Sequence, residues 1–486
     1  MGEVVGDFEG DLKELRDTFN SGKTREASWR RSQLHGIISL LKERESDIFK
    51  ALKQDLGKHH VEAYRDEIGT VAKSANYALG NLNKWMGSKR VKVPLAAFPS
   101  RGKLVPEPLG VVLIISSWNF PFGLSLEPII GAIAAGNAVL LKPSEIAPTC
   151  SSVLAETIYY YLDNSAIKVV EGGSSVGEKL LRLKFDKILY TGGPRVGQIV
   201  MAAAAKNLTP VTLELGGKCP AVVDCMSSSW DQKIAIKRII WGKFGACAGQ
   251  VCIGIDYILT QKKFAPTLVE FLKKHIKKSF GDNPMGSNNI AKIVNKKHFS
   301  RLKDLLNEPN VKNSIVYGGS LNEENLFIEP TILLDPPLDA TIMTEEIFGP
   351  LLPIITLEAI EDSIQFIRSR PKPLAIYGFT NNEKLQKRMM CETSSGSITF
   401  NDAIIQYAID TMPFGGVGGS GFGRYHGKYS FEDFSHQKAV LVRGYLIDFG
   451  FRYPPWNDKK LQLLKSGLRY NYLTLVLIKL GLKSKA

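Results

Sequence analysis

The sequence contains little cysteine and little histidine, with six Cys and seven His in 486 residues. No Cys-x-x-Cys pair has a histidine nearby, which argues against a zinc site, so we expect no metal. So few cysteines also exclude a disulfide-dense scaffold. They favour free thiols in a reducing compartment, and we therefore expect a cytoplasmic protein.

Long apolar runs are missing as well. No stretch reaches the roughly 18 apolar residues that a membrane-spanning helix needs. The N-terminus carries Glu3, Asp7, Glu9 and Asp11 and no apolar segment, so we expect no signal peptide. Hydrophobic residues nevertheless make up 44% of the chain, and a core of that size excludes an intrinsically disordered protein.

Acidic residues are absent from two basic segments. Residues 84–103 hold six Lys/Arg and residues 459–486 hold seven, so together they carry 13 of the 14 net positive charges. The remaining chain is almost neutral, which argues against nucleic acid as a partner. The apolar run from Tyr472 to Leu482 is too short to span a bilayer. It fits a tail that lies on an anionic membrane surface, or one that folds back onto the body or a partner subunit.

Apolar periodicity predicts the elements of the first half of the chain. Residues 25–56 and 66–86 have the spacing of two long amphipathic helices. Basic residues and prolines over 88–106 predict an extended excursion. Five strands then alternate with four helices, which predicts a parallel sheet with right-handed crossovers. The strands are expected at 111–115, 138–141, 167–170, 187–190 and 211–213, and the helices at 125–135, 148–162, 174–183 and 194–206.

A second α/β region is expected from 214 to 424. Its predicted helices lie near 232–242, 264–278 and 295–307, and its predicted strands near 221–224, 255–259, 351–356, 375–379 and 397–401. In parallel sheets, ligands bind beyond the carboxyl ends of the strands. The residues that follow the predicted strands are therefore the candidates for a site.

The residues that follow two of these predicted strands are suited to bind a nucleotide. Gly192-Gly193-Pro194-Arg195-Val196-Gly197 opens a predicted helix, whose first amides attract phosphate; a tight strand–helix turn explains the same residues equally well. Lys142 and Glu145, on either side of Pro143-Ser144, suit ribose hydroxyls, and an acid there repels the extra phosphate of NADP. An ordinary polar loop remains the alternative for this segment.

Three residues suit covalent chemistry. Cys252 follows a glycine turn; it is either a small buried hydrophobe or a nucleophile, which would need a pKa below the usual value of about 8.5. Glu214 ends a buried strand, where burial raises the pKa of a carboxyl group toward the range of a general base. The Asn119 amide can donate to an oxyanion, or serve only as a turn former.

Seven motifs occur in the order and approximate spacing of the aldehyde dehydrogenase superfamily, which the chain resembles over residues 10–445. They are Trp118-Asn119-Phe120-Pro121, Lys142-Pro143-Ser144-Glu145, Thr191-Gly192-Gly193, Glu214-Leu215-Gly216-Gly217, Gly249-Gln250-Val251-Cys252, Glu345-Glu346-Ile347-Phe348-Gly349-Pro350 and Pro413-Phe414-Gly415-Gly416. The segment from Gly418 through Phe434-Ser435-His436-Gln437-Lys438 resembles class 3 of that superfamily, and the sequence looks most like its plant members.

The resemblance implies NAD(P)-dependent oxidation of medium- or long-chain aliphatic, or aromatic, aldehydes to carboxylic acids through a cysteine thiohemiacetal and thioester. Cys252 would be the nucleophile and Glu214 the general base that activates water. Asn119 and the Cys252 backbone amide would form the oxyanion site. A structural or membrane-surface protein on the same scaffold, and a thiol hydrolase that uses Cys252, are the alternatives.

The resemblance also implies the cofactor, NAD with NADP as an alternative. Lys142 and Glu145 would bind the adenosine ribose, the helix after Gly193 would lie by the pyrophosphate, and Glu346 would bind the nicotinamide-side ribose with Phe348 beside it. The full set of expected cofactor-binding residues is Trp118, Lys142, Ser144, Glu145, Gly192, Gly193, Gly197, Glu346 and Phe348.

An α/β fold of the aldehyde dehydrogenase type is therefore expected. Its parts would be a Rossmann-type NAD(P)-binding domain (1–83 and 107–213), an α/β catalytic domain (214–424), a β oligomerisation arm (84–106 and 425–446) that makes a homodimer, and a basic apolar tail (447–486). The chain departs from the family at Ala246-Cys247-Ala248, where Asn is common. Cys247 is either a packing residue or a redox partner of Cys252.

Overall fold

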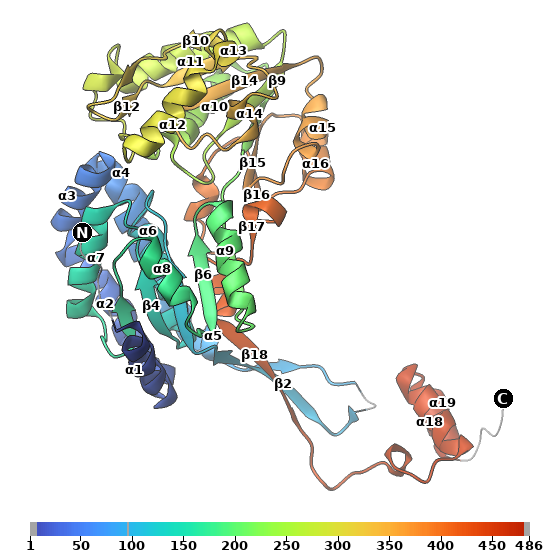
Figure 1. The fold of residues 1–486 in the computed structure, drawn as a ribbon. Helices are drawn as coiled ribbons and strands as arrows, with labels where there is room; N and C mark the ends of the chain where they lie inside the picture. The colour runs from blue at the N-terminus through green and yellow to red at the C-terminus, as the bar shows by residue number, and fades with distance from the viewer. Residues whose placement is uncertain (1–6, 95–96, 481–486) are drawn as a thin grey trace. The chain divides into compact units, whose positions relative to one another are not determined.

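The computed structural model of the chain describes residues 7–94 and 97–480, which form two compact units (Figure 1). The first unit comprises Met1–Leu82 and Pro108–Phe434, and the second comprises Asn83–Glu107 and Ser435–Ala486. Leu482, Lys483 and Lys485, which belong to the expected tail, lie outside the described residues.

A six-stranded sheet organises the first half of the first unit, in the order β17-β7-β6-β3-β4-β5. Five of the strands are parallel, and β17 pairs with β7 in the antiparallel direction. The predicted strands are confirmed: β3 (Val111–Ile115), β4 (Ala138–Lys142), β5 (Ile167–Val169), β6 (Lys187–Thr191) and β7 (Val211–Glu214), with β17 (Gly421–Phe422) at the edge. Because the strands are parallel, the residues that end β4, β6 and β7 share one edge of the sheet.

The four predicted helices of this half are also confirmed. They are α6 (Gly123–Ala135), α7 (Pro148–Tyr161), α8 (Ser174–Leu181) and α9 (Pro194–Ala205). A further helix, α1 (Phe8–Asn20), places Phe8 and Leu15 in one apolar cluster with Val111, Leu113 and residues of α8 and α9. The sheet is thereby buried, as its continuous apolar strands require.

The N-terminal helical region is more segmented than its periodicity predicts. It consists of α2 (Ala27–Glu43), α3 (Glu45–Leu56), α4 (His60–Ala63), a π-helical turn (Tyr64–Ile68) and α5 (Gly69–Met86). The single helix expected over 25–56 breaks at Arg44, whose backbone leaves the helical region (φ −105°, ψ 14°). Glu45 and Asp47 then occupy the first turn of α3, where acidic side chains favour a new helix start.

A seven-stranded sheet forms the second half of the first unit, in the order β10-β13-β14-β9-β8-β15-β16. Its strands are β8 (Pro220–Val223), β9 (Tyr257–Gln261), β10 (Ile315–Tyr317), β13 (Thr331–Leu334), β14 (Leu351–Leu357), β15 (Ala375–Phe379) and β16 (Ser397–Phe400). The five predicted strands are present. Two were missed, β10 and β13, which are short and lie at one edge of the sheet.

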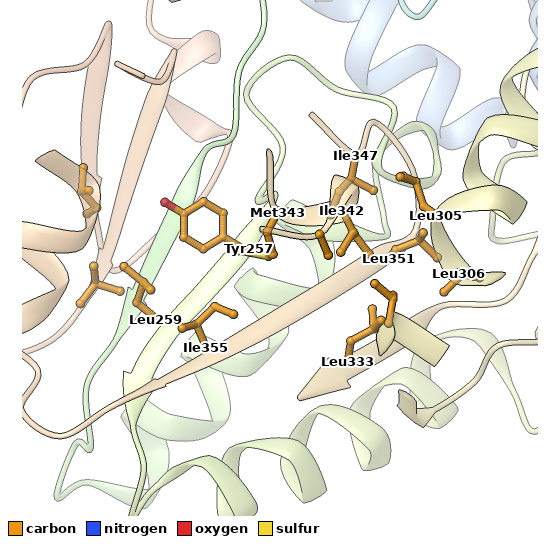
Figure 2. Packing of buried hydrophobic residues seen from close by; sticks show 14 of the residues in the cluster. Tyr257, Leu259, Leu305, Leu306, Leu333, Ile342, Met343, Ile347, Leu351 and Ile355 are labelled. Atoms are coloured by element: carbon orange, nitrogen blue, oxygen red, sulfur yellow. The ribbon is translucent and has the colours of Figure 1, made fainter. Parts of the chain in front are cut away.

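Helices pack around this second sheet and enclose its core, part of which Figure 2 shows with Tyr257, Leu333 and Ile355 among the labelled residues. The helices are α10 (Ser229–Lys243), α11 (Ala265–Phe280), α12 (Lys296–Asn307), α13 (Pro309–Lys312), α14 (Thr341–Thr344), α15 (Asp362–Arg368) and α16 (Glu383–Glu392). A small hairpin, β11 (Leu321–Asn322) with β12 (Phe327–Ile328), extends from this region.

The second unit contains a three-stranded sheet in the order β1-β2-β18 and two helices. The strands are β1 (Lys89–Val91), β2 (Arg101–Pro108) and β18 (Ser435–Val442), and the helices are α18 (Asp458–Leu468) and α19 (Tyr472–Lys479). The excursion expected over 88–106 is therefore a strand pair. Lys438 of β18 forms an ion pair with Glu107 of β2 at 2.6 Å, which links the two segments of the sheet.

The second segment of this unit begins later than the residue 425 expected from the sequence. Residues 425–434 belong to the first unit, where α17 (Lys428–Asp433) packs on α6 and the Phe434 carbonyl accepts a hydrogen bond from Asn137 at 2.9 Å. Over residues 7–94 and 97–480, no helix is both long enough and apolar enough to cross a membrane.

Candidate active site

Two cavities of the first unit meet at one short stretch of wall. The larger has a volume of about 1200 Å³ and the smaller about 150 Å³. Four residues line both cavities: Thr191, Glu214, Leu215 and Cys252. A reaction at Cys252 is therefore open to one ligand from the larger cavity and to another from the smaller one.

Cys252 lies on an irregular loop that the sequence forces into a tight turn. Cys247, Ala248 and Gly249 have consecutive positive φ angles of 45°, 50° and 80°. A Cβ atom at Gly249 would lie 2.6 Å from the carbonyl oxygen of Gly349 and 2.7 Å from that of Lys243, so only glycine fits. Strained backbone of this kind is concentrated at functional sites, and here it precedes a half-buried cysteine.

The electrostatic surroundings of Cys252 differ from those expected of a resting thiolate. Burial, followed by the carboxylates of Glu346 and Glu214, raises the pKa of the Cys252 thiol to about 12. These surroundings keep the Cys252 thiol protonated at neutral pH. A nucleophilic thiolate requires a proton acceptor or a positive charge brought into the site.

Glu214 is one of two carboxyl groups that act on the Cys252 thiol, and it is the candidate for a general base. It ends β7, is 2% exposed, and neither of its carboxylate oxygens has a hydrogen-bond partner among residues 7–94 and 97–480. Burial, with a smaller contribution from the charge of Asp433, raises the pKa of Glu214 well above 4.5. A buried carboxyl group without a partner is costly, and its position on the wall of both cavities suits a general base.

Asn119 lies on the loop between β3 and α6 and lines the larger cavity together with Cys252. Its side-chain nitrogen donates to the carbonyl oxygen of Gln250 at 2.9 Å. An amide nitrogen carries two hydrogens, so one N–H remains for an oxyanion formed beside Cys252. The three expected catalytic residues, Cys252, Glu214 and Asn119, therefore all line the larger cavity.

The larger cavity also collects most of the residues expected to bind a cofactor. Lys142 ends β4, and its ammonium group lies 2.9 Å from the carboxylate of Glu145. Gly193 is the N-cap residue of α9, and apart from its two chain neighbours no described residue lies within 4 Å of the position that a Cβ atom would occupy there. Trp118, Ser144, Gly192, Glu346 and Phe348 line the same cavity. An open helix N-terminus beside a Lys–Glu pair fits the phosphates and the ribose of a dinucleotide.

Glu346 and Phe348 also line the larger cavity. Burial raises the pKa of Glu346 to about 8. Its carboxylate lies so close to the position of a Cβ atom at Gly216 that a larger residue there would displace the Glu346 side chain. The ring of Phe348 packs edge-to-face on Trp118, with 5.4 Å between ring centroids.

Gly197 is the one expected cofactor-binding residue that does not line the larger cavity. It lies one turn into α9, where a Cβ atom would lie 3.1 Å from Leu215 and 3.5 Å from Leu213. The structure therefore places Gly197 against β7, where its small size permits close packing of helix and sheet.

The smaller cavity has a mainly apolar wall that was not predicted from the sequence. Most of its side chains are aromatic or aliphatic, with a polar group formed by Arg65, Asp66 and Thr70; the apolar ones include Phe120, Leu124, Trp241, Val251, Ile253, Ile404, Ile405, Tyr407, Phe414 and Tyr425. The only sequence signal was a cluster of large apolar residues between 404 and 414, within a segment without periodicity. A cavity of this composition suits an alkyl or aryl group.

Cys247 lies close to Cys252 in sequence but is fully buried. Its backbone N–H donates to the Glu62 carboxylate at 2.6 Å, and its sulfur lies 3.6 Å from the carbonyl oxygen of Asn119. Burial raises the pKa of the Cys247 thiol to about 12. All six cysteines are free thiols, and within the described part of the chain no group of three or more His, Cys, Asp or Glu residues is arranged to hold a metal ion.

Comparisons with known proteins show which chains and folds this protein is similar to. The model of the aldehyde dehydrogenase family matches residues 7–440. The chain is 56% identical to aldehyde dehydrogenase family 3 member F1 of Arabidopsis thaliana, over 98% of each chain, and 44% identical to family 3 member A2 of Rattus norvegicus, over 94% of this chain and 93% of the relative. A substrate-bound structure of AldH from Staphylococcus aureus superimposes with a TM-score of 0.90 at 40% identity, over 96% of this chain and 99% of that one.

Proposed function

Because the chain belongs to the aldehyde dehydrogenase family, in its class 3 branch, and is an oxidoreductase of that kind, we propose that it oxidises medium- and long-chain aliphatic or aromatic aldehydes to carboxylic acids. NAD, or NADP, is the hydride acceptor. The observation that carries the proposal is that Cys252 and Glu214 line both cavities. The aldehyde enters the smaller cavity, and the cofactor occupies the larger one.

The larger cavity has the residues that a nicotinamide dinucleotide requires. Lys142 and Glu145 would hold the adenosine ribose, the first amides of α9 would bind the pyrophosphate, and Glu346 would hold the second ribose. When bound, the cofactor supplies the hydride acceptor and a positive charge. The Glu145 carboxylate repels a 2′-phosphate, so NAD is the preferred form.

The first half-reaction takes place at the Cys252 sulfur. The thiol gives its proton to a carboxylate, and the thiolate attacks the aldehyde carbon to form a C–S bond while the carbonyl oxygen becomes an alkoxide. The free N–H of Asn119 and the Cys252 backbone amide donate to that oxygen. The alkoxide re-forms C=O as the hydride leaves, which oxidises the substrate to a thioester of Cys252.

The second half-reaction is hydrolysis of this thioester. The Glu214 carboxylate takes a proton from water, the resulting hydroxide attacks the acyl carbon, and the Cys252 thiolate leaves as the carboxylic acid forms. A carboxyl group whose pKa is raised well above 4.5 is a stronger base than an ordinary glutamate. The presence of this base favours water over a thiol or phosphate as the acyl acceptor.

The smaller cavity supports an apolar substrate. Its wall is mainly aromatic and aliphatic, and its two opposite charges, Arg65 and Asp66, already bind each other at 2.5 Å and 2.7 Å. Each methylene group buried there contributes about 0.8 kcal/mol, or about fourfold in kcat/KM. Aldehydes with longer chains are therefore the better substrates.

Two proposals concern the second unit. The β1-β2-β18 sheet is the oligomerisation arm of a homodimer. The tail binds peripherally to an anionic intracellular membrane. Helix α18 and the segment before it expose the apolar residues Trp456, Leu461 and Leu468. The basic residues Lys465 and Arg469 lie in the same segment and would attract anionic lipid.

A kinetic panel tests the proposed function. Initial rates of NADH and NADPH formation are measured with aldehydes from C4 to C16 and with benzaldehyde. We expect kcat/KM to rise with chain length until the cavity is filled, and to be higher with NAD than with NADP. A preference for small polar aldehydes, or ester cleavage with no aldehyde oxidation at any chain length, would contradict the proposal.

A further inference from the structure

A buried ion pair lies behind the proposed oxyanion site. Lys58 follows α3, and Glu67 lies in the π-helical turn Tyr64–Ile68. Both side chains are fully buried, and the Lys58 ammonium group lies 2.6 Å from the Glu67 carboxylate. Burial lowers the pKa of Lys58, but the charges of Glu67, Cys247 and Glu62 together outweigh it and raise the net pKa, so Lys58 keeps its proton. Such a pair is costly to bury, and its remaining contacts indicate why it is kept.

The contacts of this pair all fall on one five-residue loop. Lys58 Nζ donates to the carbonyl oxygen of Asn119 at 2.8 Å and lies 4.0 Å from the centre of the Phe120 ring. The second carboxylate oxygen of Glu67 accepts hydrogen bonds from the backbone N–H groups of Phe122 at 2.9 Å and Gly123 at 3.2 Å. Residues 119–123 are therefore held at both ends by one pair of opposite charges.

Residues 58–67 also hold the loop that carries Cys252. Glu62, in α4, accepts a hydrogen bond from the Cys247 backbone N–H at 2.6 Å. The Asn119 amide then donates to the Gln250 carbonyl oxygen at 2.9 Å, and the Gln250 amide donates to the Cys247 carbonyl oxygen at 2.9 Å. The loop of Asn119 and the loop of Cys252 are thus joined to each other and to residues 58–67.

At the π-helical turn, the side chains of neighbouring residues point in two different directions. Arg65 and Asp66 line the smaller cavity, whereas Glu62 and Glu67 are buried and point to the loops behind it. Single π-helical turns inside helices are frequent at functional sites because the wider turn redirects its side chains. The π-helical turn therefore separates the residues that line the smaller cavity from those that contact the buried loops.

We infer that Lys58 and Glu67 are positioning residues for aldehyde oxidation, which fix the Asn119 loop so that the Asn119 amide meets the oxyanion formed at Cys252. The inference rests on the proposed role of Asn119. It goes beyond that role, because Lys58 and Glu67 touch neither cavity and act only through the loop that they hold.

The test is a set of single and double variants in the full-length enzyme. Lys58→Met removes the ammonium group with little change of length, and Glu67→Gln removes the charge while keeping an acceptor. The matched control is Lys168→Met, which removes two ion pairs, with Asp11 at 3.1 Å and Glu14 at 2.8 Å, away from both cavities. Circular dichroism and thermal unfolding report whether each variant is folded.

We expect Lys58→Met and Glu67→Gln to lower kcat by about 10- to 100-fold, because a displaced oxyanion donor costs somewhat less than a missing one. The KM for NAD should stay within about twofold of the wild-type value, since the larger cavity is unchanged. Hydrolysis of 4-nitrophenyl acetate, which needs the oxyanion site but no hydride transfer, should fall in parallel. Lys168→Met should retain the wild-type kcat.

The decisive measurement is the double variant Lys58→Met with Asn119→Ala. If Lys58 acts through Asn119, the double variant has the kcat of Asn119→Ala within about threefold. Additive losses in kcat, or a folded Glu67→Gln variant with wild-type kcat, would overturn the inference. Wild-type activity of Asn119→Ala would instead overturn the proposed oxyanion site. If Lys58→Met does not fold, Lys58→Arg replaces it in the cycle, with a smaller loss of kcat expected.

Discussion

The His426 imidazole lies beside the Glu127 carboxylate inside the protein, with 3.0 Å between Nδ1 and Oε1. Its other nitrogen lies 3.4 Å from the carboxylate of Asp410, which also pairs with Lys73 at 3.2 Å. The ring stacks on Tyr407, which lines the smaller cavity. A buried charged contact therefore supports the wall against which the substrate is proposed to lie.

The first prediction is that stability depends on the charge of His426. Burial lowers the pKa of His426, but Glu127 and Asp410 outweigh this and raise it above 6.5. Because the folded protein holds the proton more tightly, the stabilisation is fully present below pH 6.5 and is lost as pH rises through the folded pKa. Urea unfolding at pH 6 and pH 9 should show a larger loss of stability for the wild type than for His426→Gln. Equal losses in the two proteins would contradict the prediction.

The second prediction concerns the reactivity of Cys252 without cofactor. Burial and the carboxylates of Glu346 and Glu214 raise the pKa of the thiol to about 12. At pH 9, where Glu346 with its pKa of about 8 carries a negative charge, Glu346→Gln should lower the pKa of the Cys252 thiol, increase the thiolate fraction and speed alkylation by iodoacetamide several-fold. The rate is followed by mass spectrometry of the peptide that contains Cys252. The exposed Cys391 is the internal control, and its rate should not change.

The third prediction assigns the nucleophile. Cys252→Ser should lower aldehyde-dependent NADH formation by a factor on the order of 10³ or more, because the serine hydroxyl is not ionised in this site. The control is Cys391→Ser at an exposed thiol, which should leave kcat within about twofold of the wild type. Full activity of Cys252→Ser would exclude the covalent mechanism.

The sheet and its strand ends were predictable from the sequence for a physical reason. Parallel strands buried on both faces are continuous apolar runs, so β3, β4 and β6 stand out from their surroundings, and their observed bounds differ from the predicted ones by at most one residue. Lys142 and Glu214 were found because each ends such a strand, where parallel sheets bind ligands.

The rest of the site depends on contacts between distant segments. Lys58 and Asn119 are 61 residues apart, and Lys58 stands between Gly57 and His59, so nothing local marks its side chain as buried. Tyr407 and Tyr425 reach the smaller cavity from segments without periodicity. The low thiolate fraction of Cys252 arises from burial and from the charges of two glutamates, which are properties of the assembled site rather than of the motif around the cysteine.

The fourth prediction concerns the tail. Deleting residues 459–486 removes seven Lys/Arg and no acidic residue. At about 1 kcal/mol for each basic residue near an anionic surface, the loss should weaken binding to vesicles that contain phosphatidylserine by at least tenfold. Cosedimentation measures binding, and NADH formation should remain within about twofold of the full-length value. Equal cosedimentation of the two proteins would leave no role for the tail at a membrane.

The fifth prediction separates the two half-reactions through Glu214. If Glu214 activates the water that hydrolyses the thioester, Glu214→Gln should still form about one equivalent of NADH per site in a rapid burst and then turn over roughly 10²- to 10³-fold more slowly. In the wild type, burial raises the pKa of Glu214 well above 4.5, so the deacylation rate should fall as the carboxylate is protonated, at a pH well above the usual range of a glutamate. Stopped-flow absorbance at 340 nm measures both phases. A variant that loses the burst as well would place Glu214 in the first half-reaction, as the proton acceptor of the Cys252 thiol.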